Sequence, residues 1–267
     1  MILEDDVDWD DRLRTQLGLF AFAAHTLPSL INHNIQEIQP SATESRNQDP
    51  IDLAKRSTVA LSYRDLYIPS NPYNANWDVL WLGHCGTSLP PPSLTHPDRL
   101  MYLHDITAPA PKHLRLRESA PLDPIATLYP PHTRVYHRTG NSTLCTLAYA
   151  VTQRGARKIL YELGVKDLSD GFDFELGKWC GGSDVGKRRD GDEGISSEKR
   201  LECMTVQPPL FSHYWGAKGQ SDIMGVGSRG RPEVGSRYVM RSVRGSLEEQ
   251  VEGTGKFFEQ WSHDGSN

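Results

Sequence analysis

Short apolar blocks separated by turn residues predict the β-strands of this chain. The clearest block covers residues 77–83, Trp-Asp-Val-Leu-Trp-Leu-Gly, with Asn-Pro-Tyr-Asn before it and His-Cys-Gly after it. Apolar runs of this length between turn residues are typical of buried strands. By the same criterion, we expect further strands at residues 135–137, 143–151 and 203–206.

Helical spacing of apolar positions occurs between these strands. Leu13, Leu17, Phe20 and Ala24 predict a helix over residues 10–24, begun by Asp10 or Asp11 and ended by Pro28. A second helix is expected from a cap at Thr152 to a stop at Gly164, and a short third helix over residues 171–179. Strands that alternate with helices indicate an α/β fold.

The block at residues 2–7, Ile-Leu-Glu-Asp-Asp-Val, combines apolar and acidic residues. It predicts the end of a buried strand followed by an acidic opening, the position at which ligands bind in open α/β sheets. Adjacent carboxylates need a counter-charge to stay ionised, and a divalent cation that holds a phosphate is the simplest one. Oxygen ligands suit Mg²⁺ and Mn²⁺. A strand that ends at residue 3 also predicts that the chain opens in the middle of a fold.

Composition limits the partners and the compartment. The 267 residues carry a net charge of −5, which disfavours nucleic acid as the main partner. No run of about 18 apolar residues predicts a membrane span. The four cysteines form no C-x-x-C pair, which disfavours zinc. We expect buried thiols rather than disulfides, with Cys180 and Cys203 as the best candidate pair. Asn141 opens a glycosylation sequon, used only in a secretory compartment.

Polar and glycine-rich stretches divide the chain. Residues 32–58 and 181–200 lack periodicity and predict flexible loops within one domain at 1–216. Residues 217–267 are rich in Gly, Ser and Arg and predict a separate tail, with one amphipathic helix at 246–261.

Five blocks occur in an order that is similar to a known family. They are Ile-Leu-Glu-Asp-Asp-Val, Trp-Asp-Val-Leu-Trp-Leu-Gly, Ala-Tyr-Ala-Val-Thr-Gln-Arg-Gly-Ala-Arg-Lys-Ile-Leu, Phe-Asp-Phe-Glu-Leu and Val-Gln-Pro-Pro-Leu-Phe-Ser-His. The chain resembles glycosyltransferase family 25, the lipopolysaccharide-biosynthesis and collagen galactosyltransferases, and most of all its fungal members. The resemblance runs from residue 2 to about 214 and extends toward Arg241-Ser242-Val243-Arg244.

This resemblance implies a fold, a reaction and a metal. The fold would be GT-A-like (Rossmann-like), with much of the N-terminal nucleotide-binding half expected before Met1. The reaction would be inverting transfer of a hexose, from a nucleotide-diphosphate sugar such as UDP-galactose, to a hydroxyl of a glycan or glycoprotein acceptor. The resemblance places Mn²⁺ or Mg²⁺ on Asp5, Asp6 and His213, and the donor phosphates beside Glu4 and Asp5. It implies the lumen of the Golgi or endoplasmic reticulum.

Two further residues are candidates on chemical grounds. An inverting transfer needs a carboxylate that accepts the acceptor proton, and Asp173 near a helix start is the choice; the alternative is a helix cap. Arg154 is a candidate contact of the diphosphate, and the alternative is a solvated helix face. For His213, the alternative to a metal ligand is a histidine packed between Phe211 and Tyr214.

For the whole chain, the alternative function is an inactive truncated remnant or an acceptor-binding module.

Overall fold

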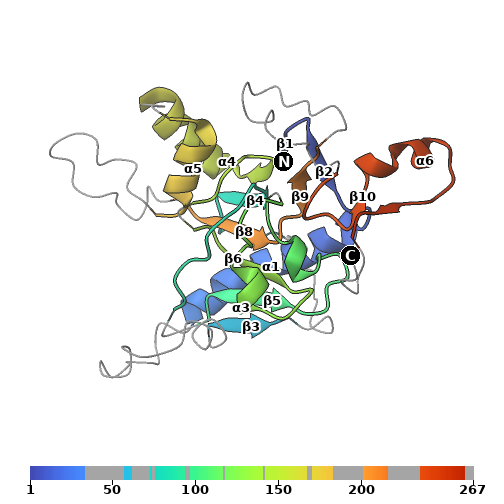
Figure 1. Ribbon diagram of the computed structural model, residues 1–267. Coiled ribbons are helices and arrows are strands. Elements are labelled where there is room, and N and C mark those ends of the chain that lie inside the picture. The colour runs from blue at the N-terminus through green and yellow to red at the C-terminus, as the bar shows by residue number, and fades with distance from the viewer. Residues whose placement is uncertain are drawn as a thin grey trace.

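The computed structural model describes residues 1–33, 57–61, 73, 76–93, 97–116, 118–140, 142–166, 170–182, 201–215 and 235–261. They form a mixed α/β structure with one large sheet (Figure 1). Its strands are β1 (Ile2–Leu3), β2 (Val7–Trp9), β3 (Thr58–Ala60), β4 (Val79–Gly83), β5 (Arg99–Tyr102), β6 (Arg134–Arg138), β7 (Ala148–Val151), β8 (Cys203–Gln207) and β9 (Phe211–His213). The longer helices are α1 (Leu13–His33), α4 (Gln153–Ile159), which continues as η4 (Leu160–Lys166), and α5 (Phe172–Cys180). Short helices are η3 (Pro111–His113), α3 (Ile125–Leu128), η6 (Arg244–Ser246) and α6 (Leu247–Val251), and β10 (Arg241–Ser242) pairs with β11 (Phe258–Glu259).

The main sheet has the strand order β1-β7-β4-β8-β6-β5-β3. Strand β4 is parallel to β8 and antiparallel to β7, and β3 is parallel to β5. Strand β9 pairs in parallel with the last residue of β4, Gly83, and its other edge pairs antiparallel with β2. The sheet is therefore mixed, as the α/β prediction allows.

Strand β4 lies between two hydrophobic clusters because successive side chains point to opposite faces of a sheet. Leu80 and Leu82 belong to the cluster formed with α1, which includes Phe20. Val79 and Trp81 belong to the cluster formed with the helices that follow β7, whose members include Leu163, Leu176 and Trp179. All five residues of β4 are buried, which explains why residues 77–83 read as the clearest strand.

Strand β1 differs from the prediction of a buried strand. It is the outermost strand of the sheet and pairs only with β7 among the described strands. Ile2 and Leu3 are 46% and 43% exposed. Their apolar character indicated burial, but a strand covered by a neighbour on only one edge leaves such side chains in contact with solvent.

Both long helical predictions need adjustment at their C-terminal ends. Helix α1 contains Pro28 and continues to His33, because Leu30 and Ile31 pack against the core beyond the proline. That packing outweighs the single backbone hydrogen bond that proline removes. The cap at Thr152 is confirmed: its hydroxyl oxygen accepts a hydrogen bond from the Gly155 amide at 3.0 Å. The helix nevertheless passes Gly164 as the π-helical turn η4.

Residues 235–261 are folded onto the sheet, in contrast to the separate tail expected at 217–267. Tyr238, Val239 and Met240 are buried, and the Asp10 carboxylate accepts a hydrogen bond from the Arg241 amide at 2.9 Å. The helix expected at 246–261 is limited to α6, and two glycines with positive φ follow it, Gly253 (72°) and Gly255 (65°). Residues 217–234, most of both predicted loops and the sequon Asn141 lie outside the described residues. None of the described helices is long and apolar enough to cross a membrane.

Candidate functional site

The acidic turn of residues 4–6 lies between β1 and β2, and strand pairing places a histidine beside it. Strand β2 pairs with β9 so that Val7 faces His213. The preceding residue, Asp6, therefore meets the imidazole: the distance from His213 Nε2 to Asp6 Oδ2 is 2.9 Å. Two residues that are 207 positions apart in the sequence thus form one polar pair.

The His213 contact stabilises the ionised form of Asp6. The hydrogen bond from His213 lowers the pKa of the Asp6 carboxyl below its ordinary value, against the opposing effect of partial burial. The charges of His213 and of Arg244 lower this pKa further. Asp6 is therefore held as a carboxylate, which is the form that binds cations.

Asp6 and His213 form a hydrogen-bonded ion pair, and a divalent cation would have to replace the proton on His213 Nε2 to bind both side chains. Cis ligands of an octahedral ion lie about 3 Å apart when each metal–ligand distance is about 2.1 Å, and the pair is separated by 2.9 Å. Asp6 Oδ1 and His213 Nδ1 are buried atoms without a hydrogen-bond partner in the described structure. The donor set, one carboxylate and one imidazole, suits Mn²⁺ better than the purely oxygen-preferring Mg²⁺.

The third predicted ligand does not join this pair. Asp5 is exposed. Among the residues that the structure describes, no group of three or more His, Cys, Asp or Glu side chains is arranged to hold a metal ion. Of the three predicted ligands, the structure therefore brings together only Asp6 and His213, and Asp5 lies on the exposed part of the turn.

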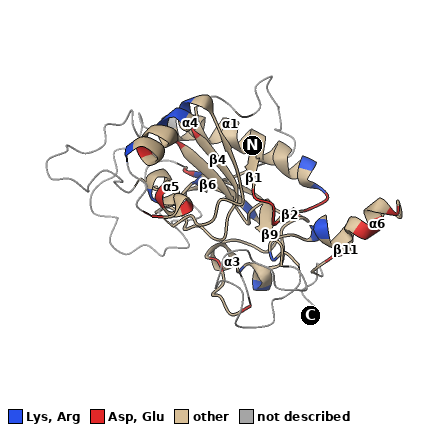
Figure 2. Ribbon diagram, turned by 90° about the horizontal axis from the view of Figure 1, so that it is seen from above, with Lys and Arg blue, Asp and Glu red and all other residues tan. Residues whose placement is uncertain are grey.

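Aromatic and cationic side chains surround the pair. The Trp215 ring stacks on the His213 ring with a centroid distance of 4.1 Å and an interplanar angle of 28°. The guanidinium of Arg244 lies 5.6 Å from the centroid of the Tyr214 ring and donates a hydrogen bond to the Asp5 carbonyl. Figure 2 shows the acidic turn between β1 and β2 on the same side of the molecule as the basic residues before α6.

Asp173 and Glu4 reach the same short segment of chain. The Cys145 amide donates a hydrogen bond to Asp173 Oδ2 at 3.1 Å. The hydroxyl of the next residue, Thr146, donates to Glu4 Oε1 at 2.8 Å. The structure thus links the predicted base to the acidic turn through residues 145–146. Asp173 lies in the first turn of α5, but the N-cap of this helix is Gly171 and no side-chain cap hydrogen bond is present, so the helix-cap alternative is not observed.

Arg154 does not reach the acidic turn. Its guanidinium Nε lies 2.7 Å from Asp78 Oδ1, at the residue before β4 begins. Asp78 lies at the C-terminal end of β7, because Val79 pairs with Val151 in the register of β4 and β7. The acidic turn lies at the N-terminal end of β7, where the Glu4 amide donates a hydrogen bond to the Leu147 carbonyl. The structure therefore separates Arg154 from the other predicted donor-site residues, Glu4 and Asp5. The fully buried carboxylate of Asp78 binds the Arg154 guanidinium at the end of β7 that is opposite the acidic turn.

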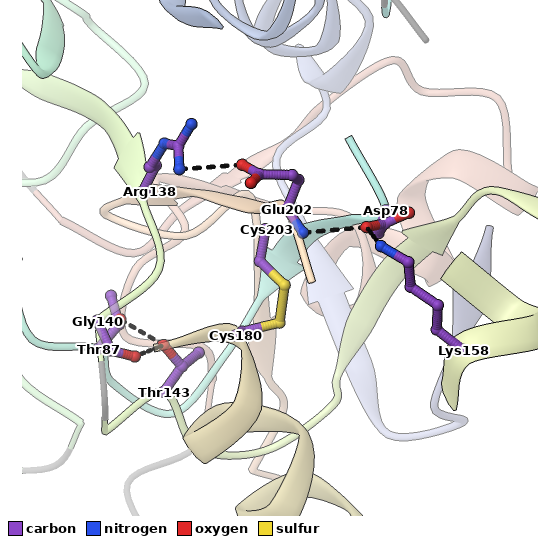
Figure 3. The surroundings of a disulfide bond; sticks show 9 residues. All are labelled: Asp78, Thr87, Arg138, Gly140, Thr143, Lys158, Cys180, Glu202 and Cys203. Atoms are coloured by element: carbon purple, nitrogen blue, oxygen red, sulfur yellow. Dashed lines mark hydrogen bonds and ion pairs between the residues drawn. A yellow bond between two sulfur atoms is a disulfide. The ribbon is translucent and has the colours of Figure 1, made fainter. Parts of the chain in front are cut away.

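Asp78 organises this opposite end (Figure 3). Its carboxylate accepts hydrogen bonds from Lys158 Nζ at 2.8 Å and from the Glu202 amide at 3.1 Å. Burial favours the protonated form of Asp78, but the hydrogen bonds from Lys158 and Arg154 outweigh it and lower the pKa of the carboxyl. This cluster is structural, since it joins α4 to the starts of β4 and β8.

All four cysteines form disulfides, which corrects the expectation of buried thiols. Cys180 bonds to Cys203, the pair that the sequence favoured, and the bond joins α5 to β8 (Figure 3). Cys85 bonds to Cys145, with a sequence separation of 60 that gave no local signal. Disulfides persist in oxidising compartments.

Several residues of the site were absent from the sequence prediction. Tyr214 and Trp215 directly follow His213, so their position after a candidate ligand was an available signal. Arg244 stands in the last block of the family resemblance, but its contact with the acidic turn depends on the folding of residues 235–246. Cys145 and Thr146 carried no motif.

Comparison with known proteins identifies no relative. The chain matches no family model, no curated protein and no solved structure.

Proposed function

We propose that this chain is a metal-dependent glycosyltransferase of the family 25 type, with a GT-A-like fold. It transfers a hexose, such as galactose, from a nucleotide-diphosphate sugar to a hydroxyl of a glycan or glycoprotein, with inversion. The observation that carries the proposal is the pairing of Asp6 with His213, because two candidate ligands from opposite ends of the sequence meet at one turn. The mixed α/β sheet and the order of the five sequence blocks support it.

Each residue has a distinct role in this proposal. Asp6 and His213 would hold the divalent cation, and Glu4 and Asp5 line the turn on the donor side. When bound, the cation supplies Lewis-acid stabilisation of the leaving diphosphate. Asp173 accepts the proton of the acceptor hydroxyl as that hydroxyl attacks the anomeric carbon from the face opposite the leaving group. The two disulfides are consistent with a luminal compartment.

Replacing Asp6 tests the metal role. We expect Asp6→Asn to weaken Mn²⁺ binding by about 10-fold or more, because a neutral amide is a much poorer ligand than a carboxylate. Titration followed by Mn²⁺ electron paramagnetic resonance measures the affinity, and release of UDP from UDP-galactose measures turnover. Glu248→Gln, a change of the same kind on the exposed surface of α6, is the matched control. Equal Mn²⁺ affinity in Asp6→Asn and wild type would contradict the assignment.

Replacing Asp173 tests the base. We expect Asp173→Asn to lower kcat by about 100-fold to 10,000-fold, because an amide does not accept the acceptor proton. Mn²⁺ affinity should stay at the wild-type value, since Asp173 is not a ligand of the pair. Full activity in Asp173→Asn would leave only a structural role for this residue, as the acceptor of the Cys145 amide hydrogen bond.

A second candidate function is an acceptor-binding module without catalysis. The observation that favours it is the two-member ligand set, which is smaller than the predicted three. Glycan-array binding without hydrolysis or transfer of any nucleotide sugar, and without Mn²⁺ binding, would support this alternative over the enzyme.

A further inference from the structure

The C-terminal segment of residues 235–246 is bonded to the strand that follows the acidic turn. The fully buried carboxylate of Asp8 accepts hydrogen bonds from the hydroxyls of Ser236 at 2.8 Å and Ser242 at 2.5 Å. It also accepts one from the backbone amide of Arg244 at 3.0 Å. A buried carboxylate with several donors holds them tightly, because leaving it unsatisfied is costly. The backbone of Arg244 is therefore fixed at Asp8, which stands two residues after Asp6 in the sequence.

From this anchor, the Arg244 side chain lies between the neighbours of both candidate ligands. It donates to the carbonyl of Asp5, which precedes Asp6, and its guanidinium lies over the ring of Tyr214, which follows His213. The Arg244 guanidinium thus lies beside the Asp6–His213 pair.

Arg244 is also unlike most arginines of the described chain in its partners. Arg12, Arg134 and Arg154 each form an ion pair with an aspartate. No carboxylate of the described residues forms an ion pair with Arg244; its partners there are a backbone carbonyl and an aromatic face. Because no carboxylate of the described residues neutralises this guanidinium, its positive charge is available to an anionic ligand. Its planar fork matches phosphate oxygens in a bidentate manner.

We infer that Arg244 is a binding residue for the diphosphate of the nucleotide sugar, beside the Asp6–His213 pair. This inference rests on the proposed function. It makes residues 235–246 part of the donor site, so that the two ends of the chain together bind one anion. Tyr214 orients the guanidinium through its ring face.

Isothermal titration of Mn²⁺-saturated protein with UDP, and separately with inorganic pyrophosphate, tests the inference. We expect Arg244→Ala to weaken both affinities by about 10-fold to 100-fold, the effect of removing a charge-assisted hydrogen bond to phosphate. Arg244→Lys keeps the charge without the fork and should give an intermediate loss. Arg157→Ala, on the exposed side of α4, is the matched control and should bind both ligands as the wild type does.

The outcomes separate this inference from the proposed function. Unchanged UDP and pyrophosphate affinities in Arg244→Ala overturn the inference and leave the proposed function standing. A parallel loss of Mn²⁺ affinity, measured without phosphate ligand, also overturns it, because Arg244 would then only hold the acidic turn in place. Wild-type binding of pyrophosphate but not of UDP supports the phosphate role and contradicts the nucleotide-sugar role. Binding of neither ligand by the wild type overturns both.

Discussion

Acidification from pH 7 to pH 4 is expected to lower the free energy of unfolding by about 3 kcal/mol through each of two fully buried histidines, His84 and His137. Burial lowers the pKa of His84 to about 4 and that of His137 to about 4. Both side chains are neutral in the folded protein. His84 Nε2 donates to the Val206 carbonyl at 3.0 Å, and His137 Nδ1 donates to the Arg138 carbonyl at 2.6 Å.

The sign of this effect follows from the direction of the pKa shifts. In the unfolded chain these imidazoles gain a proton near pH 6.5, whereas in the folded protein they resist protonation until about pH 4. The unfolded state therefore binds more protons in this window, so stability is complete above about pH 6.5 and falls as the pH decreases to 4. Carboxylates with lowered pKa values, such as Asp105, lose their contribution only at lower pH.

Urea unfolding at half-unit intervals from pH 7 to pH 4.5 measures this slope. His84→Gln removes one titrating group and should reduce the slope by about 1.4 kcal/mol per pH unit. A surface change, His25→Gln on α1, serves as the comparison. A slope that is the same in wild type and His84→Gln would show that this histidine does not resist protonation in the folded state.

Asp105→Ala is expected to destabilise the fold by about 3–5 kcal/mol, because it leaves a buried arginine without its counter-charge. The Arg134 side chain is fully buried, and its Nε lies 2.5 Å from Asp105 Oδ2. Arg134 also donates to the Pro208 carbonyl at 2.5 Å and to the Thr107 hydroxyl at 3.1 Å. The Gln16 side chain of α1 donates to the same hydroxyl at 2.8 Å. One network thus joins α1, β6 and the turn after β8.

Urea denaturation at pH 7 measures the effect, and two variants sharpen it. Glu162→Ala removes the partner of Lys166 in an exposed pair and should cost no more than about 1 kcal/mol. The double variant Asp105→Leu, Arg134→Met removes both charges, and we expect it to be more stable than Asp105→Ala. Equal losses in the buried and exposed single variants would contradict the argument.

Local patterns located the long helices and the central strands of the sheet but only part of the site. Residues 77–83, 135–137 and 203–206 were predicted as strands and lie in β4, β6 and β8. Their apolar runs reflect burial on both faces, which is a local property of the sequence. Helix ends were less accurate: the packing of Leu30 and Ile31 extends α1 beyond Pro28, and local propensity contains no information on such packing.

Long-range pairing decided the site. The sequence by itself determined that an acidic turn follows the first strand, that Asp173 lies near the start of a short helix and that His213 follows a late strand. The tertiary structure alone decided that Asp6 meets His213, that Arg154 bonds to Asp78 and that Arg244 returns to the acidic turn. Strand register and buried charge control these contacts, and both depend on residues that are distant in the chain. A fully buried carboxylate such as Asp78 is costly to leave unpaired, and only the folded sheet brings Arg154 and Lys158 to it.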